Sequence, residues 1–412
     1  PLHRPTFPPG RHNQSPLSGR EPELEAIRQI LLAIHNLPPP TRQRESRKTG
    51  AADHRPRLAH FVMIMGETGI GKTRLAEEIT QEAHALGWRV AWTRAYEQEG
   101  TIPYRPWTDI LRTLLQDIPL DELLSMIQGK TGPITEEASS ALGPAATAQA
   151  KLARLSALLP EIVTSQVLHL QQNLPSLSLS PEQERFHLWE TMLTLLNALS
   201  QSTPLLLVLD DLHWTDDSSM ELLAYLARHQ QNERIMLIGT CRDRELSPSA
   251  TLRALLNDLR REGTLAAFPL EPLTQAQIAR LIAHLPYELV RSIQTQAGGN
   301  PLFAEELARF SETAQSNHRD DENTAYLEGN HKKASGASRG KRAAALPETV
   351  SAVLERRLYE LSSECQTLLS KAAVLGGSFE FSLLLRLIGE TGQSEDLTLD
   401  LLEEALRAGL LI

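Results

Sequence analysis

The sequence predicts an α/β fold in which helices cover a parallel β-sheet, and three observations support it. Short apolar runs alternate with longer segments whose apolar residues recur at helical spacing, as in parallel sheets with helical connections. The run at residues 61–65 leads through the glycine-rich residues 66–71 into a helix-like stretch. The run at residues 205–209 is apolar throughout, which indicates a central strand buried on both faces. Sheets of this kind hold ligands at the carboxyl ends of their strands.

The amino-terminal part predicts a linker, one helix and a flexible insert. Residues 1–16 contain five prolines and no apolar periodicity, which is typical of a linker. From Glu23 onward apolar residues recur at helical spacing, until three prolines beginning at Pro38 end the helix. Residues 38–57 hold six Arg or Lys against two acidic residues, so we expect a flexible, solvated insert. A nucleic-acid contact by this insert is the less favoured alternative.

Five strands are expected along the chain. The strand ahead of the glycine-rich residues is followed by a helix at residues 72–86, and Gly87 ends that helix before the second strand. A strand, a helix and a strand in this order form a βαβ unit, which implies parallel pairing. The predicted strands are residues 58–65, 89–95, 205–209, 235–239 and 264–270.

The other segments predict helices and one further linker. Residues 104–199 show Leu-rich helical periodicity, interrupted by Gly-Pro pairs, and predict a mainly helical insert. Residues 271–310 predict a helical domain. Residues 311–346 are polar and nearly free of large apolar groups, which predicts a disordered linker. Helical patterning resumes at Pro347 and predicts a small helical module over residues 347–412.

Residues 66–73 fit the phosphate-binding pattern G-x-x-x-x-G-K-[ST] at every fixed position. In this pattern the loop amides face a β-phosphate, Lys72 reaches the β- and γ-phosphates, and the Thr73 hydroxyl binds Mg²⁺. The sequence therefore predicts a P-loop within a nucleotide-binding domain over residues 17–270; an ordinary glycine turn is the less favoured alternative. The residues expected to contact the nucleotide here are Gly66, Glu67, Thr68, Gly69, Ile70, Gly71, Lys72, Thr73 and Arg74.

Two carboxylates supply the second half of the predicted site. Asp210 and Asp211 follow the strand at residues 205–209, at the edge where open α/β sheets hold ligands. Asp210 is expected to hold Mg²⁺ through water, and Asp211 to polarise the attacking water. An acidic loop without such a role is the alternative. The polar residues 216–218 are expected to cap the following helix.

Arg242 lies just past the strand predicted at residues 235–239. If that strand runs between the P-loop strand and the acidic strand, Arg242 faces the γ-phosphate and senses its charge. Arginine suits this role because its planar fork binds phosphate oxygens at two points and keeps its proton. The alternative is a surface salt bridge to Asp243, Glu245 or Asp211. The expected catalytic residues are Lys72, Asp210, Asp211 and Arg242.

Composition narrows the class of protein. The 412 residues are 41% hydrophobic and 22% charged, which suits a soluble protein of roughly two to four domains. No apolar run approaches the roughly 18 residues that span a bilayer, so we expect no membrane contact. The net charge of -10 argues against a dominant nucleic-acid surface. The two cysteines, Cys241 and Cys365, are expected to be free thiols in the cytoplasm.

Several motifs resemble those of the signal-transduction ATPases with numerous domains (STAND). The resemblance is closer to the Orc1-like AAA ATPase module of large LuxR-type bacterial regulators. Residues 209–216 read LDDLHWTD, and the family typically follows its acidic pair with Leu-His-Trp. Residues 18–21 read SGRE, residues 104–107 read YRPW and residues 299–303 read GNPLF, which resemble further motifs of the family.

The resemblance covers residues 17–310 and 347–412 and implies an ASCE/AAA-like P-loop NTPase fold. In this family residues 271–310 correspond to a helical lid domain, and residues 347–412 to part of a winged-helix domain. A family histidine that senses the β-phosphate from the winged-helix domain is expected to fall beyond Ile412. We expect the chain to be a fragment of a longer protein.

The resemblance also implies adenine contacts. Gly19 and Arg20 are expected near the adenine and ribose of ATP or ADP, and Pro301 is expected to pack on the adenine. The alternatives are that Arg20 starts a helix and that Asn300 caps a helix in which Pro301 is the first residue. Both readings of Pro301 are compatible with each other.

The function that the resemblance implies is an ATP-hydrolysing switch. ADP keeps the module compact and inactive, whereas ATP and an unknown signal, a ligand or a protein, open it and permit self-association. Its output is expected to be transcriptional regulation or another signalling activity, with any DNA contact made by domains outside this chain. The alternatives are a nucleotide-binding scaffold without significant turnover and an AAA-type motor or loader acting on DNA.

Overall fold

The computed structural model describes slightly more than half of the chain. The described residues are 17–37, 59–96, 103–116, 118–119, 122, 180–229, 234–242, 250–312, 355, 358–359, 361–375, 381–388, 395–407 and 410. The predicted linker at 1–16, the insert at 38–57, most of the helical insert and nearly all of the linker at 311–346 lie outside them. The predictions for those segments stay predictions.

The described residues divide into two compact units. The first unit comprises residues 20–68 and 72–270 and contains the sheet. The second unit comprises residues 17–19, residues 69–71 at the tip of the glycine-rich loop, and the residues from Glu271 onward.

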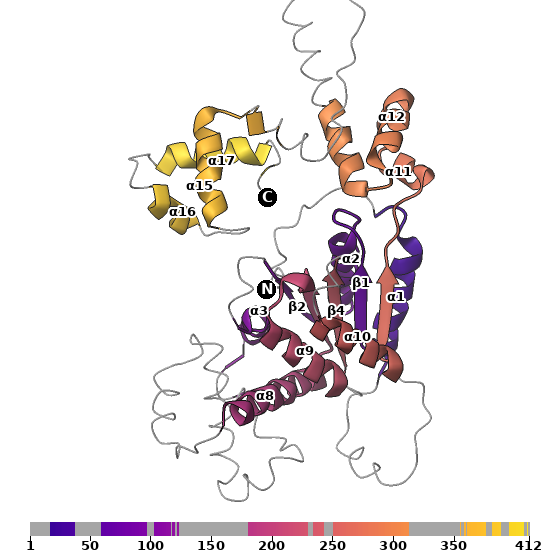
Figure 1. Cartoon of the computed structure of the whole chain (residues 1–412), viewed down its shortest axis with the longest axis vertical. Coiled ribbons are helices and arrows are strands. Elements are labelled where there is room, and N and C mark those ends of the chain that lie inside the picture. Colours follow the sequence, from indigo (N-terminus) through magenta and orange to yellow (C-terminus); the bar gives the residue numbers. More distant parts are fainter. Residues whose placement is uncertain are drawn as a thin grey trace, which may run out of the picture. The chain divides into compact units, whose positions relative to one another are not determined.

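Five parallel strands form the sheet of the first unit, in the order β2-β3-β4-β1-β5 (Figure 1). The predicted α/β fold with a parallel sheet is therefore confirmed. Strand β4 lies between the P-loop strand β1 and the acidic strand β3, which is the order that the hypothesis for Arg242 requires. The strands are β1 (Phe61–Met65), β2 (Arg89–Arg94), β3 (Leu205–Asp210), β4 (Ile235–Cys241) and β5 (Leu265–Pro269).

Strands β3 and β4 extend beyond the apolar runs that predicted them. Strand β3 includes Asp210, and β4 includes Thr240 and Cys241. Backbone pairing continues through polar residues because every residue offers the same N–H and C=O groups to the ladder. Strand β5 lies at the sheet edge and is only half-buried, which explains its weaker apolar pattern.

Helices cover both faces of this sheet (Figure 1). Alternate strand residues such as Leu205 and Leu207 belong to one large apolar core, and the residues between them point to the other face. Helices α1 (Glu21–His35) and α2 (Lys72–Ala85) pack together and contact the strands. The helices that share the large core are α3 (Arg105–Leu115), α8 (Pro181–Ser202), α9 (Asp217–His229) and α10 (Ala250–Glu262).

Helix α8 begins at Pro181 and ends at Ser202, three residues beyond the predicted end of the helical insert at residue 199. The Ser180 side chain accepts a hydrogen bond from the Gln183 backbone N–H, and the Gln183 side chain accepts one from the Ser180 N–H. This capping box, with Pro181 at the first helical position, fixes the amino end. The helix continues past Leu199 to Ser202 because polar residues can prolong a helix whose apolar face has ended.

Two groups of helices make up most of the described part of the second unit. Helix α11 (Gln275–Leu281), helix α12 (Tyr287–Ala297) and the helical residues 301–312 share one apolar core. The other core belongs to α15 (Ser363–Val374), α16 (Phe381–Ile388) and α17 (Glu395–Arg407). The predicted helical character of both segments is confirmed for the residues that the structure describes. The assignment of residues 347–412 to a winged-helix domain stays a prediction.

Two further expectations concern the cysteines and membranes. Neither Cys241 nor Cys365 forms a disulfide, as the sequence predicted, and both are buried. Among the residues that the structure describes, no helix combines the length and apolar character needed to cross a bilayer.

Candidate nucleotide-binding site

The glycine-rich loop joins β1 to α2 and has backbone angles that favour glycine. Gly69 and Gly71 have φ values of 78° and 103°, which side-chain-bearing residues rarely adopt. A Cβ atom built on Gly71 would meet nothing within 4 Å, so the space beside this residue is open. At the tip of the loop, the Gly69 carbonyl accepts a hydrogen bond from the Leu302 N–H at 3.3 Å. The loop therefore adopts backbone angles that glycine reaches without strain, with open space beside Gly71, as suits a phosphate-binding loop.

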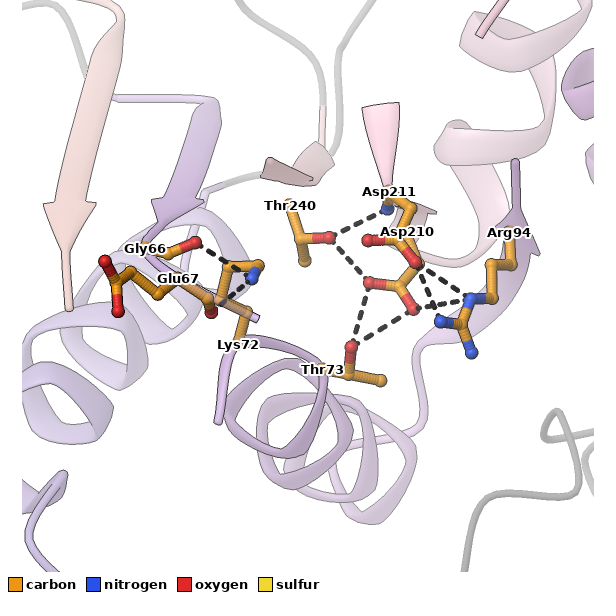
Figure 2. Close-up of polar contacts among 8 residues, drawn as sticks. All are labelled: Gly66, Glu67, Lys72, Thr73, Arg94, Asp210, Asp211 and Thr240. Atoms are coloured by element: carbon orange, nitrogen blue, oxygen red, sulfur yellow. Dashed lines mark hydrogen bonds and ion pairs between the residues drawn. The ribbon is translucent and has the colours of Figure 1, made fainter. Parts of the chain in front are cut away.

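Lys72 is the first residue of α2 and folds back over the loop (Figure 2). Its Nζ donates hydrogen bonds to the carbonyl oxygens of Gly66 at 3.0 Å and Glu67 at 2.9 Å. Burial lowers the pKa of the Lys72 ammonium, and the charges of Asp211 and Asp210 oppose this shift. The carbonyl oxygens hold a cationic group close to the two carboxylates, where it can exchange carbonyl partners for phosphate oxygens.

Asp210 lies at the carboxyl end of β3, with only 1% of its surface exposed. The Thr73 hydroxyl donates to its carboxylate, with distances of 3.1 and 3.2 Å to the two oxygens, and the Thr240 hydroxyl donates to Oδ1 at 2.6 Å. Burial and then the charge of Asp211 raise the pKa of Asp210, against the hydrogen bonds from the two threonines. The structure thus brings together Thr73 and Asp210, the two predicted Mg²⁺ ligands (Figure 2).

Asp211 turns the chain out of the sheet. It has left-handed backbone angles, φ 58° and ψ 47°, and precedes a short 3-10 helix, Leu212–Trp214. Its backbone N–H donates to the Thr240 hydroxyl at 2.8 Å. Its carboxylate oxygen Oδ2 pairs with Arg94, 2.9 Å from Nε and 2.8 Å from Nη2. The second acidic residue is therefore held both through its backbone and through its side chain.

Sequence reasoning did not identify Arg94 and Thr240. Arg94 ends β2 and lies in register with Asp210 on β3, so its guanidinium reaches both carboxylates. Thr240 lies near the end of β4 on the other side of β3 and joins Asp210 to Asp211. Both are polar residues at the ends of predicted strands, a signal that identifies site residues only when the strand order is known.

Arg242 follows β4, as predicted, and its guanidinium carbon lies 5.9 Å from the centroid of the Trp214 ring. Its charge also contributes to the lowered pKa of Lys72, after burial, which is the main cause. Two of the acidic residues proposed for an alternative salt bridge, Asp243 and Glu245, lie outside the described residues. The role of Arg242 as a charge sensor stays a prediction.

The predicted helix cap just beyond the acidic pair is confirmed. The Asp216 carboxylate accepts a hydrogen bond from the Ser219 N–H at 2.8 Å, at the amino end of α9. Asp216 therefore caps a helix, and residues 217 and 218 form its first turn.

Arg20 and Pro301, two of the residues expected at the adenine, have the structural roles at helix starts that were given above as alternatives. Arg20 directly precedes α1 and pairs with Glu23 at 3.6 Å, so it lies at a helix start. Asn300 accepts a hydrogen bond from the Phe303 N–H at 3.3 Å, and Pro301 is the first residue of the helix at 301–312. The carbonyl of Gly19 is engaged as an acceptor within the second unit. These roles leave the adenine contacts of Gly19, Arg20 and Pro301 as predictions.

The remaining loop residues differ in what they can offer a ligand. Ile70 is buried, with 2% of its surface exposed, so its side chain packs inside the protein. The Arg74 guanidinium pairs with Glu78 and Glu77 on its own helix. Thr68 and Glu67 lie in the loop itself, where Glu67 supplies a carbonyl to Lys72.

The donor set fits Mg²⁺ better than a metal held wholly by protein side chains. Within the described residues, no cluster of three or more His, Cys, Asp or Glu has the geometry to hold a metal ion. Mg²⁺ in nucleotide sites is usually held by one or two protein oxygens together with phosphates and water. The hydroxyl of Thr73 and the carboxylate of Asp210 provide such a pair.

Comparison with known proteins agrees with the nucleotide-binding site inferred from the geometry of the sheet region. Residues 46–238 match the family model described as AAA ATPase domain. An uncharacterized protein of Rhizobium meliloti (strain 1021) is 26% identical over 347 residues, which are 81% of this chain and 29% of that protein. The chain thus spans less than a third of the relative that it matches.

Two solved structures show low overall similarity. Cdc6p from Pyrobaculum aerophilum is 16% identical with a TM-score of 0.39, over 98% of this chain and 89% of that chain. A variant of Thermotoga maritima RuvB is 14% identical with a TM-score of 0.36, over 95% of this chain and 88% of that chain. Support for a nucleotide-binding site therefore comes from the family match and from the geometry of the site, and not from these two structures. Residues 46–238, which include the P-loop and the acidic pair, are therefore similar to an AAA ATPase domain, and this similarity supports a nucleotide-binding module.

Proposed function

We propose that this chain is an ATP-driven signal-transduction switch of the STAND type, with an Orc1-like AAA ATPase module that hydrolyses ATP slowly with Mg²⁺. One observation carries the proposal: Lys72, Thr73 and the acidic pair meet at the carboxyl edge of the sheet, where Thr73 hydrogen-bonds Asp210 directly. An acidic loop without a role in the site would not explain why Asp210 is buried against the Thr of the P-loop.

The first step is the grip on the triphosphate. The amides of the loop and the amino end of α2 bind phosphate oxygens, because both present N–H donors and partial positive charge. Lys72 exchanges the carbonyls of Gly66 and Glu67 for the β- and γ-phosphates. In this proposal the adenine end contacts Gly19, Arg20 and Pro301, as in the family that the chain resembles.

The second step is the arrangement of Mg²⁺ and water. Thr73 and Asp210 would hold Mg²⁺, which when bound offsets the negative charge of the phosphate oxygens. Asp211 then orients and polarises the attacking water. Its carboxylate is paired with Arg94 in the present arrangement, so this pairing has to loosen before Asp211 can accept a proton from water.

The third step is the switch. The γ-phosphate adds contacts with Lys72 and Arg242 that ADP cannot make, and only such differential contacts can shift a conformational equilibrium. ADP therefore favours the compact inactive form, ATP and a signal favour an open form that associates with further copies, and hydrolysis resets it. In this proposal the chain acts in the cytoplasm as part of a multidomain transcriptional regulator whose DNA contacts lie in other domains.

Nucleotide content and phosphate release of the purified chain test the proposal. We expect bound ADP or ATP and turnover of about 10⁻³ to 10⁻² s⁻¹, as in other switch NTPases. Lys72→Ala should abolish binding, whereas Asp211→Asn should keep it and lower turnover roughly 100-fold. Asp258→Asn is the matched control, because Asp258 pairs with Arg228 on helices away from the loop.

The possible results separate the competing functions. A wild-type chain that binds neither ATP nor ADP would end the proposal. Bound nucleotide without measurable turnover in the wild-type chain would favour a nucleotide-holding scaffold, and unchanged turnover in Asp211→Asn would contradict the role of Asp211. Salt-dependent DNA binding by this chain would favour a motor or loader, which the net charge of -10 disfavours.

A further inference from the structure

A cavity of about 500 Å³ in the first unit is lined by side chains of α8, α9 and α10. Small-molecule sites typically have volumes of about 300 to 1,000 Å³. The lining includes no residue of the P-loop, of the acidic pair or of the end of β4. The cavity is therefore a candidate for a ligand other than the nucleotide. The lining residues that matter here are Trp189, Glu221, Tyr225, Arg228, His229 and Ala254.

Aromatic rings in contact with one another form one side of the cavity. The ring centroids of Trp189 and Tyr225 lie 5.5 Å apart, and His229 stacks on Tyr225 at 4.2 Å. Trp189 Nε1 donates a hydrogen bond to the Tyr104 hydroxyl at 3.3 Å, which fixes the indole ring. The Trp189 and Tyr225 rings are tilted by 42°, and the Arg185 guanidinium carbon lies 5.4 Å from the centroid of the Trp189 ring. The ring faces and edges that remain favour an aromatic ligand, which can pack on either.

The charged groups around the cavity are already paired. Arg228 lies 2.6 Å from the Asp258 carboxylate, and Glu221 lies 2.9 Å from Arg185. Burial and a nearby carboxylate raise the pKa of Tyr225 to about 12, so its hydroxyl is neutral. Arg228 and Glu221, the charged side chains paired in this way, would therefore give a charged ligand no partner unless one of these pairs breaks.

His229 gives the cavity one hydrogen-bonding preference. Its Nδ1 lies 2.7 Å from the Tyr225 carbonyl oxygen, and a carbonyl oxygen only accepts, so Nδ1 is the donor. In the neutral ring Nε2 is then an acceptor. A ligand with an N–H donor matches this acceptor.

We propose that this cavity binds a neutral bicyclic aromatic heterocycle that carries an N–H group. The ligand packs against the rings of Trp189, Tyr225 and His229 and leaves the ion pairs of Arg228 and Glu221 intact. This site is separate from the nucleotide site, and the proposal stands whether or not the chain hydrolyses ATP.

Indole is the probe that tests the proposal, observed by saturation-transfer NMR with the whole chain. We expect binding with a dissociation constant of about 1 mM, which is ordinary for a ligand of this size. Ala254→Trp fills the cavity and should reduce the transfer at least about fivefold. Arg253→Trp is the matched control, because it adds the same ring at the neighbouring exposed position, which does not line the cavity.

Charged analogues and ADP complete the experiment. Tryptamine and indole-3-acetate carry the same ring with opposite charges, and both should bind at least about fivefold more weakly than indole. Saturating ADP should leave the indole signal unchanged. Trp189→Leu removes one wall of the cavity and should also reduce the signal, which keeps the test decisive if Ala254→Trp does not fold.

Three results would overturn the proposal. They are no transfer from indole to the wild-type chain, transfer that survives both Ala254→Trp and Trp189→Leu in folded protein, and displacement of indole by ADP. Tighter binding of either charged analogue would overturn the assignment of a neutral ligand.

Discussion

Thr240→Val tests how the two carboxylates of the site are held in place. Thr240 is fully buried, and its hydroxyl donates to Asp210 Oδ1 at 2.6 Å and accepts from the Asp211 N–H at 2.8 Å. Valine has nearly the same shape without the hydroxyl. The substitution therefore removes two hydrogen bonds while leaving the packing of β4 almost unchanged.

The expected loss of stability follows from these two bonds. A hydrogen bond to a charged group contributes about 1.5 to 3 kcal/mol, and a buried N–H left without an acceptor costs about 1 to 3 kcal/mol. Both contributions to the free energy depend on the same hydroxyl, and the site relaxes in part after the substitution. The total loss is therefore smaller than the sum of the two contributions. We expect the free energy of unfolding to fall by about 3 kcal/mol.

Urea unfolding followed by tryptophan fluorescence is the suitable assay. All the tryptophans of the chain belong to the first unit, so their emission reports on the sheet domain alone; they are Trp88, Trp92, Trp107, Trp189 and Trp214. Thr93→Val is the matched control. Thr93 is 5% exposed on β2, and its hydroxyl has no hydrogen-bond partner within the described part of the chain. That control should change stability by less than about 0.5 kcal/mol.

The loss of stability caused by Thr240→Val should also depend on pH. The pKa of Asp210 is raised above its ordinary value of 3.8, so the folded state binds more protons than the unfolded state between the two values. Stability therefore falls as pH rises through this window. Because Thr240→Val removes a donor that lowers the pKa of Asp210, its destabilisation should be larger at pH 8 than at pH 5. Equal effects of Thr240→Val and Thr93→Val at pH 8 would refute the reasoning.

Two other substitutions test single contacts. Arg94→Gln frees the Asp211 carboxylate; because the Arg94 side chain is 47% exposed, stability should fall by no more than about 1 kcal/mol. Phosphate release should rise several-fold in that variant if Asp211 polarises water, and unchanged or slower release would contradict this role. Gly239→Ala places a Cβ 2.5 Å from Leu212 Cδ1, so stability should fall by about 1 to 3 kcal/mol. In urea unfolding, the double variant Gly239→Ala/Leu212→Ala should lose less stability than the sum of the losses of the two single variants. A loss equal to that sum would show that the two residues do not clash.

Much of the site could be predicted from the sequence because its first half is local. The motif at residues 66–73 lies in consecutive residues, so the angles of Gly71, the fold-back of Lys72 and the start of α2 follow from short-range geometry. The acidic pair could be predicted because Asp210 ends an apolar run long enough to be a central strand.

Thr240 and Arg94 could not be assigned to the site in this way. Thr240 meets the carboxylates because β4 lies beside β3, and Arg94 meets them because it pairs in register with Asp210. Every residue offers the same backbone groups to a neighbouring strand, so an apolar pattern fixes that a strand forms but not which strand lies next to it.

The sequence by itself determined the parallel α/β class, the phosphate-binding loop and the acidic strand end, because each depends on residues close together in the chain. Only the tertiary structure decided which side chains hold Asp210 and Asp211, and that α8, α9 and α10 leave a cavity between them. The physical reason is that strand order, register and imperfect packing between helices depend on contacts between distant segments, whose free energy no local pattern records.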